Sequence, residues 1–347
     1  MRTWLAAAGL VAWFLAALPI MAQQPAVDFF STRLPRWFPL PKIPVDNPIT
    51  ESKVELGRQL FYDVRLSGNG TYSCGSCHQQ ALAFTDGLAH ALGSTGESHA
   101  RSTMSLVNVV YNASFGWNER LSSLEAQMEV PMHNQQPIEM GFKGREVEVL
   151  ARFRANDRDA GRFRAAFPED ESPVTLPNII KAIASFERVL ISADSPFDRY
   201  VFKDDRTAMS DSARRGLALF FSDRLRCSEC HGSINLSGPT TFAGTMPSDP
   251  EAFFHDTGIA AHPAKFRAPT LRNIAVTSPY MHDGSIATLA DVVQHYARGG
   301  RPRREKSDRV PGFAISPSET DDLVAFLRSL TDEAFLTNPA FSDPHIK

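Results

Sequence analysis

The chain has 347 residues, of which 43% are hydrophobic and 22% are charged, and its formal net charge is −3 at pH 7. This length allows one large domain or two medium-sized domains with substantial hydrophobic cores. This near-neutral balance gives no support to binding of nucleic acid or of anionic membranes, and we expect neither partner.

The N-terminus has the pattern of a secretory signal peptide. Arg2 precedes an apolar run from Trp4 to Ala22, which ends in a small residue. We therefore predict a signal peptide at residues 1–22, Sec export to the bacterial periplasm, and no membrane contact after cleavage. An uncleaved membrane anchor is the alternative, because the run is just long enough to span a bilayer. The proline-rich residues 23–48 predict an extended arm.

The remainder of the chain repeats one arrangement twice. Gly-x-x-Leu-Phe segments start at Gly57 and Gly216, on predicted helices for which Thr50 and Ser210 are suitable N-caps. A glycine at this place suits a close crossing with a second helix, where a side chain would obstruct. The repeat indicates a duplicated domain.

Each Gly-x-x-Leu-Phe segment is followed by a Cys-x-x-Cys-His motif. All four cysteines of the chain belong to these motifs, so no disulfide is expected. Two thiols at this spacing can form thioethers to one haem, and the adjacent histidine can then bind the iron. A zinc site shared by the two cysteine pairs is the alternative, but it would not need a histidine after both. We predict two covalently bound haem c groups, attached at Cys74, Cys77 and His78 and at Cys227, Cys230 and His231.

Each half is predicted to end in an amphipathic helix. Apolar residues recur at helical spacing from Ile179 to Leu190 and again from Leu323 to Leu330. Ser316 can cap the second of these helices, with Pro317 in its first turn and Glu319 completing a capping box.

The fold class is therefore mainly α, with two cytochrome c-like domains. Their expected boundaries are 49–192 for the N-terminal haem domain, 193–209 for the linker, 210–335 for the C-terminal haem domain and 336–347 for the tail.

Several stretches between and after the two motifs resemble the bacterial di-haem cytochrome c peroxidase and MauG superfamily. The start of the first half looks closest to the MbnH-like branch, which is found with methanobactin operons. The stretches are Leu82–Gly87, Trp117 with Leu124–Gln127, Pro137–Met140, and Leu271–Ile274 running into Pro279–Gly284.

The resemblance implies roles for residues near the first haem. Trp117 would lie between the haems, followed ten residues later by Gln127 and after four more by Pro131. Glu139 would be the distal acid that handles protons, although it lies two residues beyond the family position, so we expect an insertion within residues 133–136. No histidine stands at the usual distal position near residues 93–96, which favours an open first haem. His90 and His99 are close enough in sequence to leave distal ligation open.

The resemblance also assigns the second haem and a calcium ion. The second iron ligand lies nineteen residues after Thr277, at Tyr296; ordinary peroxidases place Met there and MauG places Tyr. A phenolate would favour oxidised iron. Met281 is a competing ligand, although it matches the usual aromatic position before a histidine. Calcium is expected at backbone oxygens of Thr277 and Pro279, but Ser102 stands where the family has Asn, which weakens that site.

Three functions follow from these assignments. The preferred one is a MauG/MbnH-like peroxidase that uses hydrogen peroxide to form a bis-Fe(IV) state and oxidises a Trp or Tyr of a periplasmic partner, such as a copper-binding protein. The first alternative is an ordinary cytochrome c peroxidase supplied with electrons by a small cytochrome or cupredoxin. The second is a non-catalytic di-haem electron carrier, in which both irons would be closed.

Overall fold

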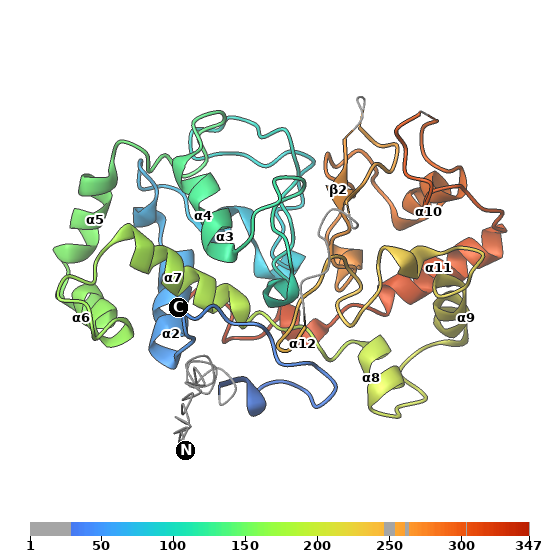
Figure 1. The fold of residues 1–347 in the computed structure, drawn as a ribbon, viewed down its shortest axis with the longest axis horizontal. Coiled ribbons are helices and arrows are strands. Elements are labelled where there is room, and N and C mark those ends of the chain that lie inside the picture. Colours follow the sequence, from blue (N-terminus) through green and yellow to red (C-terminus); the bar gives the residue numbers. More distant parts are fainter. Residues whose placement is uncertain (1–28, 246–253, 261–263, 303, 347) are drawn as a thin grey trace, which may run out of the picture.

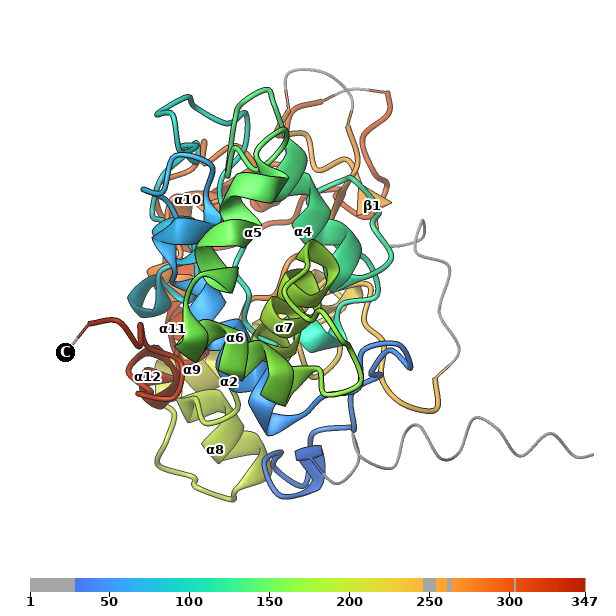
Figure 2. The same ribbon diagram turned by 90° about the vertical axis from the view of Figure 1, so that its left-hand side faces the viewer.

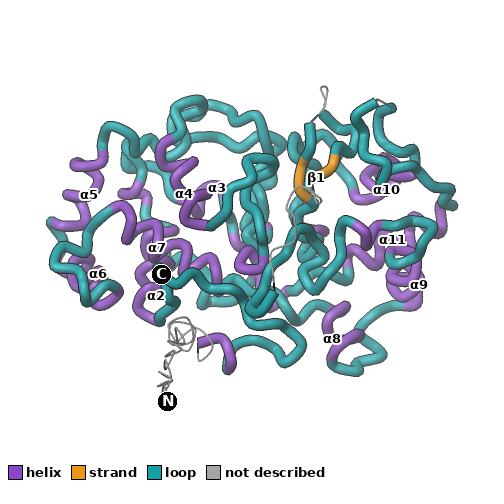
Figure 3. The backbone as a smooth tube through the Cα atoms, in the orientation of Figure 1, coloured by secondary structure: helices purple, strands orange, loops and turns teal. Residues whose placement is uncertain are grey.

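The computed structural model describes residues 29–245, 254–260, 264–302 and 304–346, so the predicted signal peptide at 1–22 lies outside the described residues. Two mainly helical halves lie side by side (Figure 1). Within each half, long loops connect the helices and make up much of the chain (Figure 3). Among the described residues, no helix is both long and apolar enough to cross a lipid bilayer. The mainly α, two-domain cytochrome c-like fold predicted from the sequence is confirmed.

The N-terminal half contains helices α2 to α7, and Figure 2, which views the molecule from the side of this half, shows α5, α6 and α7 in front. The bounds in this half are α2 Glu51–Phe61, α3 Cys74–Cys77, α4 Leu124–His133, α5 Glu146–Arg154, α6 Asp157–Ala166 and α7 Leu176–Arg188. Short 3-10 helices span Val64–Leu66, Gln80–Leu82 and Val109–Tyr111.

The C-terminal half contains helices α8 to α12 and one short antiparallel strand pair. The bounds are α8 Pro196–Phe202, α9 Asp211–Phe220, β1 Phe254–His255, β2 Phe266–Arg267, α10 Leu289–Ala297, α11 Pro317–Arg328 and α12 Glu333–Leu336. In the strand pair, Phe254 is opposite Arg267. Further 3-10 helices span Cys227–Glu229 and Ile274–Val276.

The helix starts that the sequence predicts are present. The Thr50 hydroxyl accepts from the backbone N–H of Lys53 at 3.3 Å, and Ser210 does the same for Ala213 at 3.1 Å. At α11, Ser316 and Glu319 form the reciprocal capping box. These contacts satisfy backbone donors that a helix leaves unpaired in its first turn, which explains why short polar motifs mark the helix starts correctly.

The two glycines lie at equivalent helix crossings, α2 against α7 and α9 against α11. A Cβ atom built on Gly57 would stand 1.9 Å from the carbonyl oxygen of Ala182, and one on Gly216 would stand 1.9 Å from that of Asp322. Only a residue without a side chain allows backbones to approach so closely. The close approach of two helix backbones therefore explains the glycine at this position in both halves.

The apolar stripes of α7 and α11 form the centres of the two cores. Ile179, Ile183 and Phe186 are fully buried in the first core, and Phe326 is fully buried in the second. The last members of each stripe, Leu190 and Leu330, lie two residues beyond their helices but remain buried. The helices thus end before the apolar pattern does.

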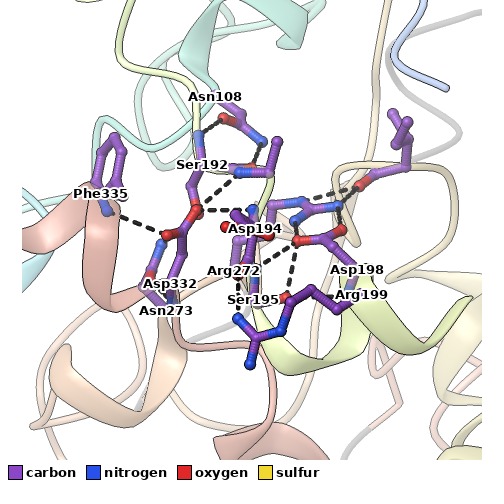
Figure 4. Close-up of polar contacts among 12 residues, drawn as sticks. Asn108, Ser192, Asp194, Ser195, Asp198, Arg199, Arg272, Asn273, Asp332 and Phe335 are labelled. Carbon is purple, nitrogen blue, oxygen red and sulfur yellow. Dashed lines mark hydrogen bonds and ion pairs between the residues drawn. The ribbon is translucent and has the colours of Figure 1, made fainter. Parts of the chain in front are cut away.

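A buried polar network joins the two halves, as Figure 4 shows. The Asp332 carboxylate accepts from the backbone N–H groups of Ala193 and Asp194, both at 2.9 Å, and Asn273 accepts from the N–H of Asp332 at 2.7 Å. Nearby, Arg272 and Asp198 form a fully buried, two-pronged ion pair at 2.8 and 2.9 Å. These bonds fix the segment that connects the halves against the end of the second core.

The C-terminal segment returns to the first half. Phe335 and Leu336 of α12 belong to the first hydrophobic core, and the Tyr62 hydroxyl donates to the carbonyl of Phe341 at 2.7 Å. No local sequence pattern predicts this return. It adds a second physical link between the halves.

Candidate active site

The first Cys-x-x-Cys-His motif forms a helical turn, α3, at the wall of a cavity that we call the first cavity. Cys74, Cys77 and His78 all line it. His78 Nδ1 lies 2.8 Å from the carbonyl oxygen of Phe84. Because a carbonyl can only accept, Nδ1 carries the hydrogen and Nε2 keeps its lone pair. Burial lowers the pKa of His78, which also favours the neutral imidazole that binds a metal.

The second motif has the same arrangement at a second cavity. Cys227, Cys230 and His231 line this second cavity. His231 Nδ1 donates to the carbonyl oxygens of Leu236 and Pro269, at 3.2 and 3.1 Å. Burial lowers the pKa of His231 to about 4, so this imidazole is also neutral with Nε2 available. Fixing the ring through its other nitrogen is the usual way in which proteins orient a histidine ligand.

The two cavities are similar in size and in the reactive groups that line them. Their accessible volumes are similar, about 240 Å³ for the second and 210 Å³ for the first. Each has two free thiols and one oriented histidine in its wall. The Cys74/Cys77 pair lines one cavity and the Cys227/Cys230 pair lines the other, and the described residues do not bring the two pairs together as one metal site. The donor set therefore suits thioether attachment of haem better than a metal site of thiolates.

Trp117 lies between the two cavities and lines both. Its indole N–H donates to the carbonyl oxygen of Ser102 at 2.9 Å, and its own carbonyl accepts from the N–H of Arg267 at 3.1 Å. The ring meets His282 edge to face with centroids 6.4 Å apart. An aromatic ring held in this way is in place to pass an electron between groups bound in the two cavities.

Gln127 and Pro131 line the first cavity from one face of α4, one helical turn apart. Pro131 has no N–H, so the helix leaves the Gln127 carbonyl without its usual donor. The carbonyl of Pro131 accepts from the N–H of Met140 at 3.0 Å, which holds the following loop against the helix. This contact positions the neighbouring residue Glu139.

Glu139 also lines the first cavity. The amide of Asn134 donates to its Oε1 at 2.8 Å. Between α4 and Glu139 the chain makes a tight turn closed by a bridge from Gln135 to Ile138. A turn of this kind can hold the two extra residues that the sequence spacing requires.

The two histidines left open as distal ligands have different surroundings. His90 is exposed and is not among the described residues that line either cavity. His99 lines the first cavity, and its Nδ1 accepts from the N–H of Arg101 at 3.1 Å. The hydrogen of His99 must then be on Nε2, which lies 3.7 Å from Glu139 Oε1. This geometry places His99 beside the acid.

Tyr296, on the last turn of α10, lines the second cavity together with His231. Met281, the competing ligand, lines the same cavity, so the structure brings both candidates to the second motif. Burial raises the pKa of the Tyr296 phenol, and a phenolate at this place would therefore need a nearby cation such as ferric iron. Met281 has φ +76°, and its carbonyl accepts from the Ser102 hydroxyl at 3.0 Å.

The residues predicted for calcium also lie at the inner wall of the second cavity. Thr277 and Pro279 line it, and so does Ser102. Both polar oxygens of Ser102 are already engaged, the hydroxyl with Met281 and the carbonyl with Trp117. The described residues contain no group of three or more His, Cys, Asp or Glu side chains suited to a metal, but the expected ligands are backbone oxygens.

Sequence reasoning missed Glu187, which lines the first cavity from α7. The residue is only 6% exposed, and burial raises the pKa of its carboxyl to about 8. Its sequence position contains a signal, because it lies four residues after Ile183 on the apolar face of the helix. A charged residue on that face is an exception that could have identified it.

Comparison with known proteins agrees with this arrangement. The model of the family described as di-haem cytochrome c peroxidase matches residues 51–206, and the cytochrome c model matches residues 213–331. The methylamine utilization protein MauG of Methylorubrum extorquens is 34% identical over 88% of this chain and 85% of its own length. The cytochrome c551 peroxidase of Pseudomonas aeruginosa is 33% identical over 82% of this chain and 80% of its own length.

Among solved structures, a MauG-like protein associated with microbial copper homeostasis has a TM-score of 0.85 and 41% identity, over 90% of this chain and 98% of that one. Its agreement extends over both halves. The chain therefore belongs to the di-haem cytochrome c peroxidase and MauG family of peroxidase-type oxidoreductases, whose cofactor is haem c.

Proposed function

We propose that the protein uses hydrogen peroxide to oxidise a Trp or Tyr side chain of a periplasmic partner protein. The observation that carries this proposal is that Trp117 lines both cavities, with Glu139 at the first and Tyr296 at the second. Such an arrangement suits an enzyme in which peroxide reacts at one haem while the second haem shares the oxidising equivalents. The similarity to MauG supports this function over simple electron carriage.

His78 and His231 would bind the two irons through Nε2, and Cys74, Cys77, Cys227 and Cys230 would hold the two porphyrins. When bound, the haems would supply peroxide cleavage and storage of two oxidising equivalents. Tyr296 would complete the coordination of the second iron. An anionic oxygen ligand favours oxidised iron over reduced iron, which suits storage of oxidising power better than a thioether does.

Glu139 would move the proton that peroxide cleavage requires. Its carboxylate can take a proton from the near oxygen of peroxide and return it to the far oxygen, which becomes water. The Asn134 amide donates to Oε1 at 2.8 Å and so holds the carboxyl group at the wall of the first cavity. His99 Nε2 lies 3.7 Å from the same oxygen, beyond hydrogen-bond distance, so His99 would be a polar neighbour of the acid in the first cavity.

The partner would be a periplasmic protein, and a copper-binding protein is the class we favour. The support is the similarity to a MauG-like protein associated with microbial copper homeostasis.

This proposal includes cleavage of residues 1–22, the domain boundaries at 49–192 and 210–335, and a calcium ion at the backbone of Thr277 and Pro279.

Met281 supports one rival function. If its thioether bound the second iron in place of Tyr296, the protein would resemble an ordinary peroxidase that removes peroxide with electrons from a small cytochrome or cupredoxin. Met281 lines the same cavity as Tyr296, so the rival is physically specific.

The experiment that tests the proposal mixes the haem-loaded protein with peroxide and a Trp-containing periplasmic copper-binding protein, without any reductant. Mass spectrometry should then find a Trp peptide of the partner with two electrons removed or oxygen added. Trp117→Phe should reduce the yield without loss of haem. A requirement for prior reduction, with electrons taken only from a small cytochrome, would instead favour the rival.

A further inference from the structure

Arg267, in strand β2, is a buried cation for which the described residues supply no counter-ion. The residue is 4% exposed. Its guanidinium donates one hydrogen bond, to the side-chain oxygen of Asn112 at 2.9 Å, and its Nε–H is buried without any acceptor. Burial alone lowers its pKa to about 10, with no nearby acid to oppose the effect.

The other buried arginines show what Arg267 lacks. Three arginines are buried in the described part of the chain, and two of them face a carboxylate. Arg272 pairs with Asp198 at 2.8 Å, and Arg188 pairs with Glu125 at 2.8 Å. An unpaired charge in a protein interior costs several kcal/mol, so buried charges are almost always paired. An anion is therefore expected to join Arg267 in the complete protein.

The surroundings of Arg267 identify the place of that anion. The residue lines both cavities, and its backbone N–H donates to the carbonyl of Trp117. Arg101 lies close by, with its guanidinium 4.9 Å from the ring of Phe266 and its Nη1 also buried without an acceptor. Arg101 lines only the first cavity. Two incompletely bonded guanidinium groups thus face the space that the cofactors would occupy.

We propose that Arg267 is the counter-ion of a haem propionate at the junction of the two haems. A propionate is a carboxylate carried by the cofactor itself, and guanidinium binds carboxylates with two parallel hydrogen bonds. The proposal rests on the haem c sites of the proposed function but not on its peroxide chemistry. Because Arg267 lines both cavities, the propionate can belong to either haem.

The charge of Arg267 then influences the redox equilibrium. A positive group close to a haem favours the reduced iron, which carries one positive charge less than the oxidised iron. Removing this charge therefore favours the oxidised iron. Removal also leaves the propionate as a buried, unpaired anion, whose negative charge favours the oxidised iron as well. Arg267→Gln should therefore favour the ferric state of the haem that carries the propionate.

The test is a spectroelectrochemical titration of the haem-loaded protein at neutral pH, where the guanidinium is charged and the propionate beside it is ionised. Arg267→Gln should shift the ferric-to-ferrous ratio of one haem at least tenfold at fixed potential, which equals about 59 mV for one electron. Arg267→Lys should keep the potential close to the wild-type value, because it keeps the charge. Arg164→Gln, on the exposed face of α6, removes the same charge far from both cavities and should leave both potentials unchanged.

The haem that shifts identifies the owner of the propionate, and a shift of both haems means that the guanidinium is shared. Equal potentials in Arg267→Gln and the wild-type protein would overturn the proposal. If that variant does not fold, a crystal structure of the wild-type holoprotein decides the question. A propionate oxygen within hydrogen-bond distance of Arg267 supports the proposal, whereas water, chloride or a protein carboxylate in that place refutes it. Neither measurement uses peroxide or a partner, so failure of the proposed function would leave both results intact.

Discussion

Gly216→Ala is the substitution whose effect follows most directly from the structure. The new methyl group would stand 1.9 Å from the carbonyl oxygen of Asp322 and 2.8 Å from Cβ of Phe326, whereas ordinary contact begins at 3.4 Å. Because the first obstacle is backbone, no side-chain rotation relieves the clash, and α9 must move away from α11. Overpacking of this kind costs roughly 1–3 kcal/mol or more.

The same substitution has an opposing effect that can be separated. Alanine in a helix interior is favoured over glycine by about 1 kcal/mol. The net result should be a loss of about 0–2 kcal/mol or more in the free energy of unfolding, measured by denaturant titration of the haem-loaded protein. Gly161→Ala is the matched control, because the nearest atom to its new methyl group is the end of Arg164 at 3.9 Å. That variant should gain stability from helix propensity alone.

Gly57→Ala should repeat the loss in the first half, because its obstacle is the Ala182 carbonyl at the same 1.9 Å. If Gly216→Ala and Gly161→Ala changed stability equally, the close helix crossing would not be the reason for glycine at position 216. The reasoning that connects the duplicated Gly-x-x-Leu-Phe segments to the fold would then be wrong.

Three further predictions concern the two cavities. Tyr296→Met should keep both haems attached but raise the reduction potential of the second haem, because a thioether ligand favours reduced iron. Peroxide should then no longer remove the ferric signals of both haems. If peroxide still removed both signals in this variant, the assignment of Tyr296 as the ligand would be refuted. Glu139→Gln should slow peroxide cleavage about 10²–10⁴-fold in stopped-flow absorbance, with little change in peroxide access, and an unchanged rate would remove this carboxyl from the mechanism. Glu187→Gln tests the buried carboxyl whose folded-state pKa is about 8, against an ordinary value of 4.5. The folded protein binds this proton more tightly than the unfolded chain, so its destabilising contribution is absent below about pH 4.5 and grows until about pH 8. The variant should therefore be more stable than wild type by roughly 3 kcal/mol at pH 7 and equal to it at pH 4, as measured by denaturant titration, and equal stability at both pH values would contradict the assignment.

The features that sequence predicted well are those with local causes. A serine or threonine cap acts within one turn, so Thr50, Ser210 and Ser316 mark helix starts without knowledge of the fold. The glycine crossings were predictable because the same short segment occurs before both cysteine motifs. The two Cys-x-x-Cys-His motifs likewise place thiols and histidine on one turn, whatever surrounds them.

The features that sequence could not predict arise from contacts between distant segments. Nothing near Phe335 indicates that it packs into the first core, because its neighbours there come from the other end of the chain. His99 is brought to Glu139 by a hairpin whose register no local pattern specifies. Arg267 is conspicuous only when the absence of a carboxylate partner can be seen.

Electron paramagnetic resonance of the purified ferric protein, before and after one equivalent of peroxide, tests the central claim most directly. The claim is that the two haems are unequal, with the first open to peroxide and the second bound by His231 and Tyr296. We predict one high-spin and one low-spin ferric signal at the start, and loss of both after peroxide without any added reductant. Two low-spin signals that peroxide leaves unchanged would contradict the account.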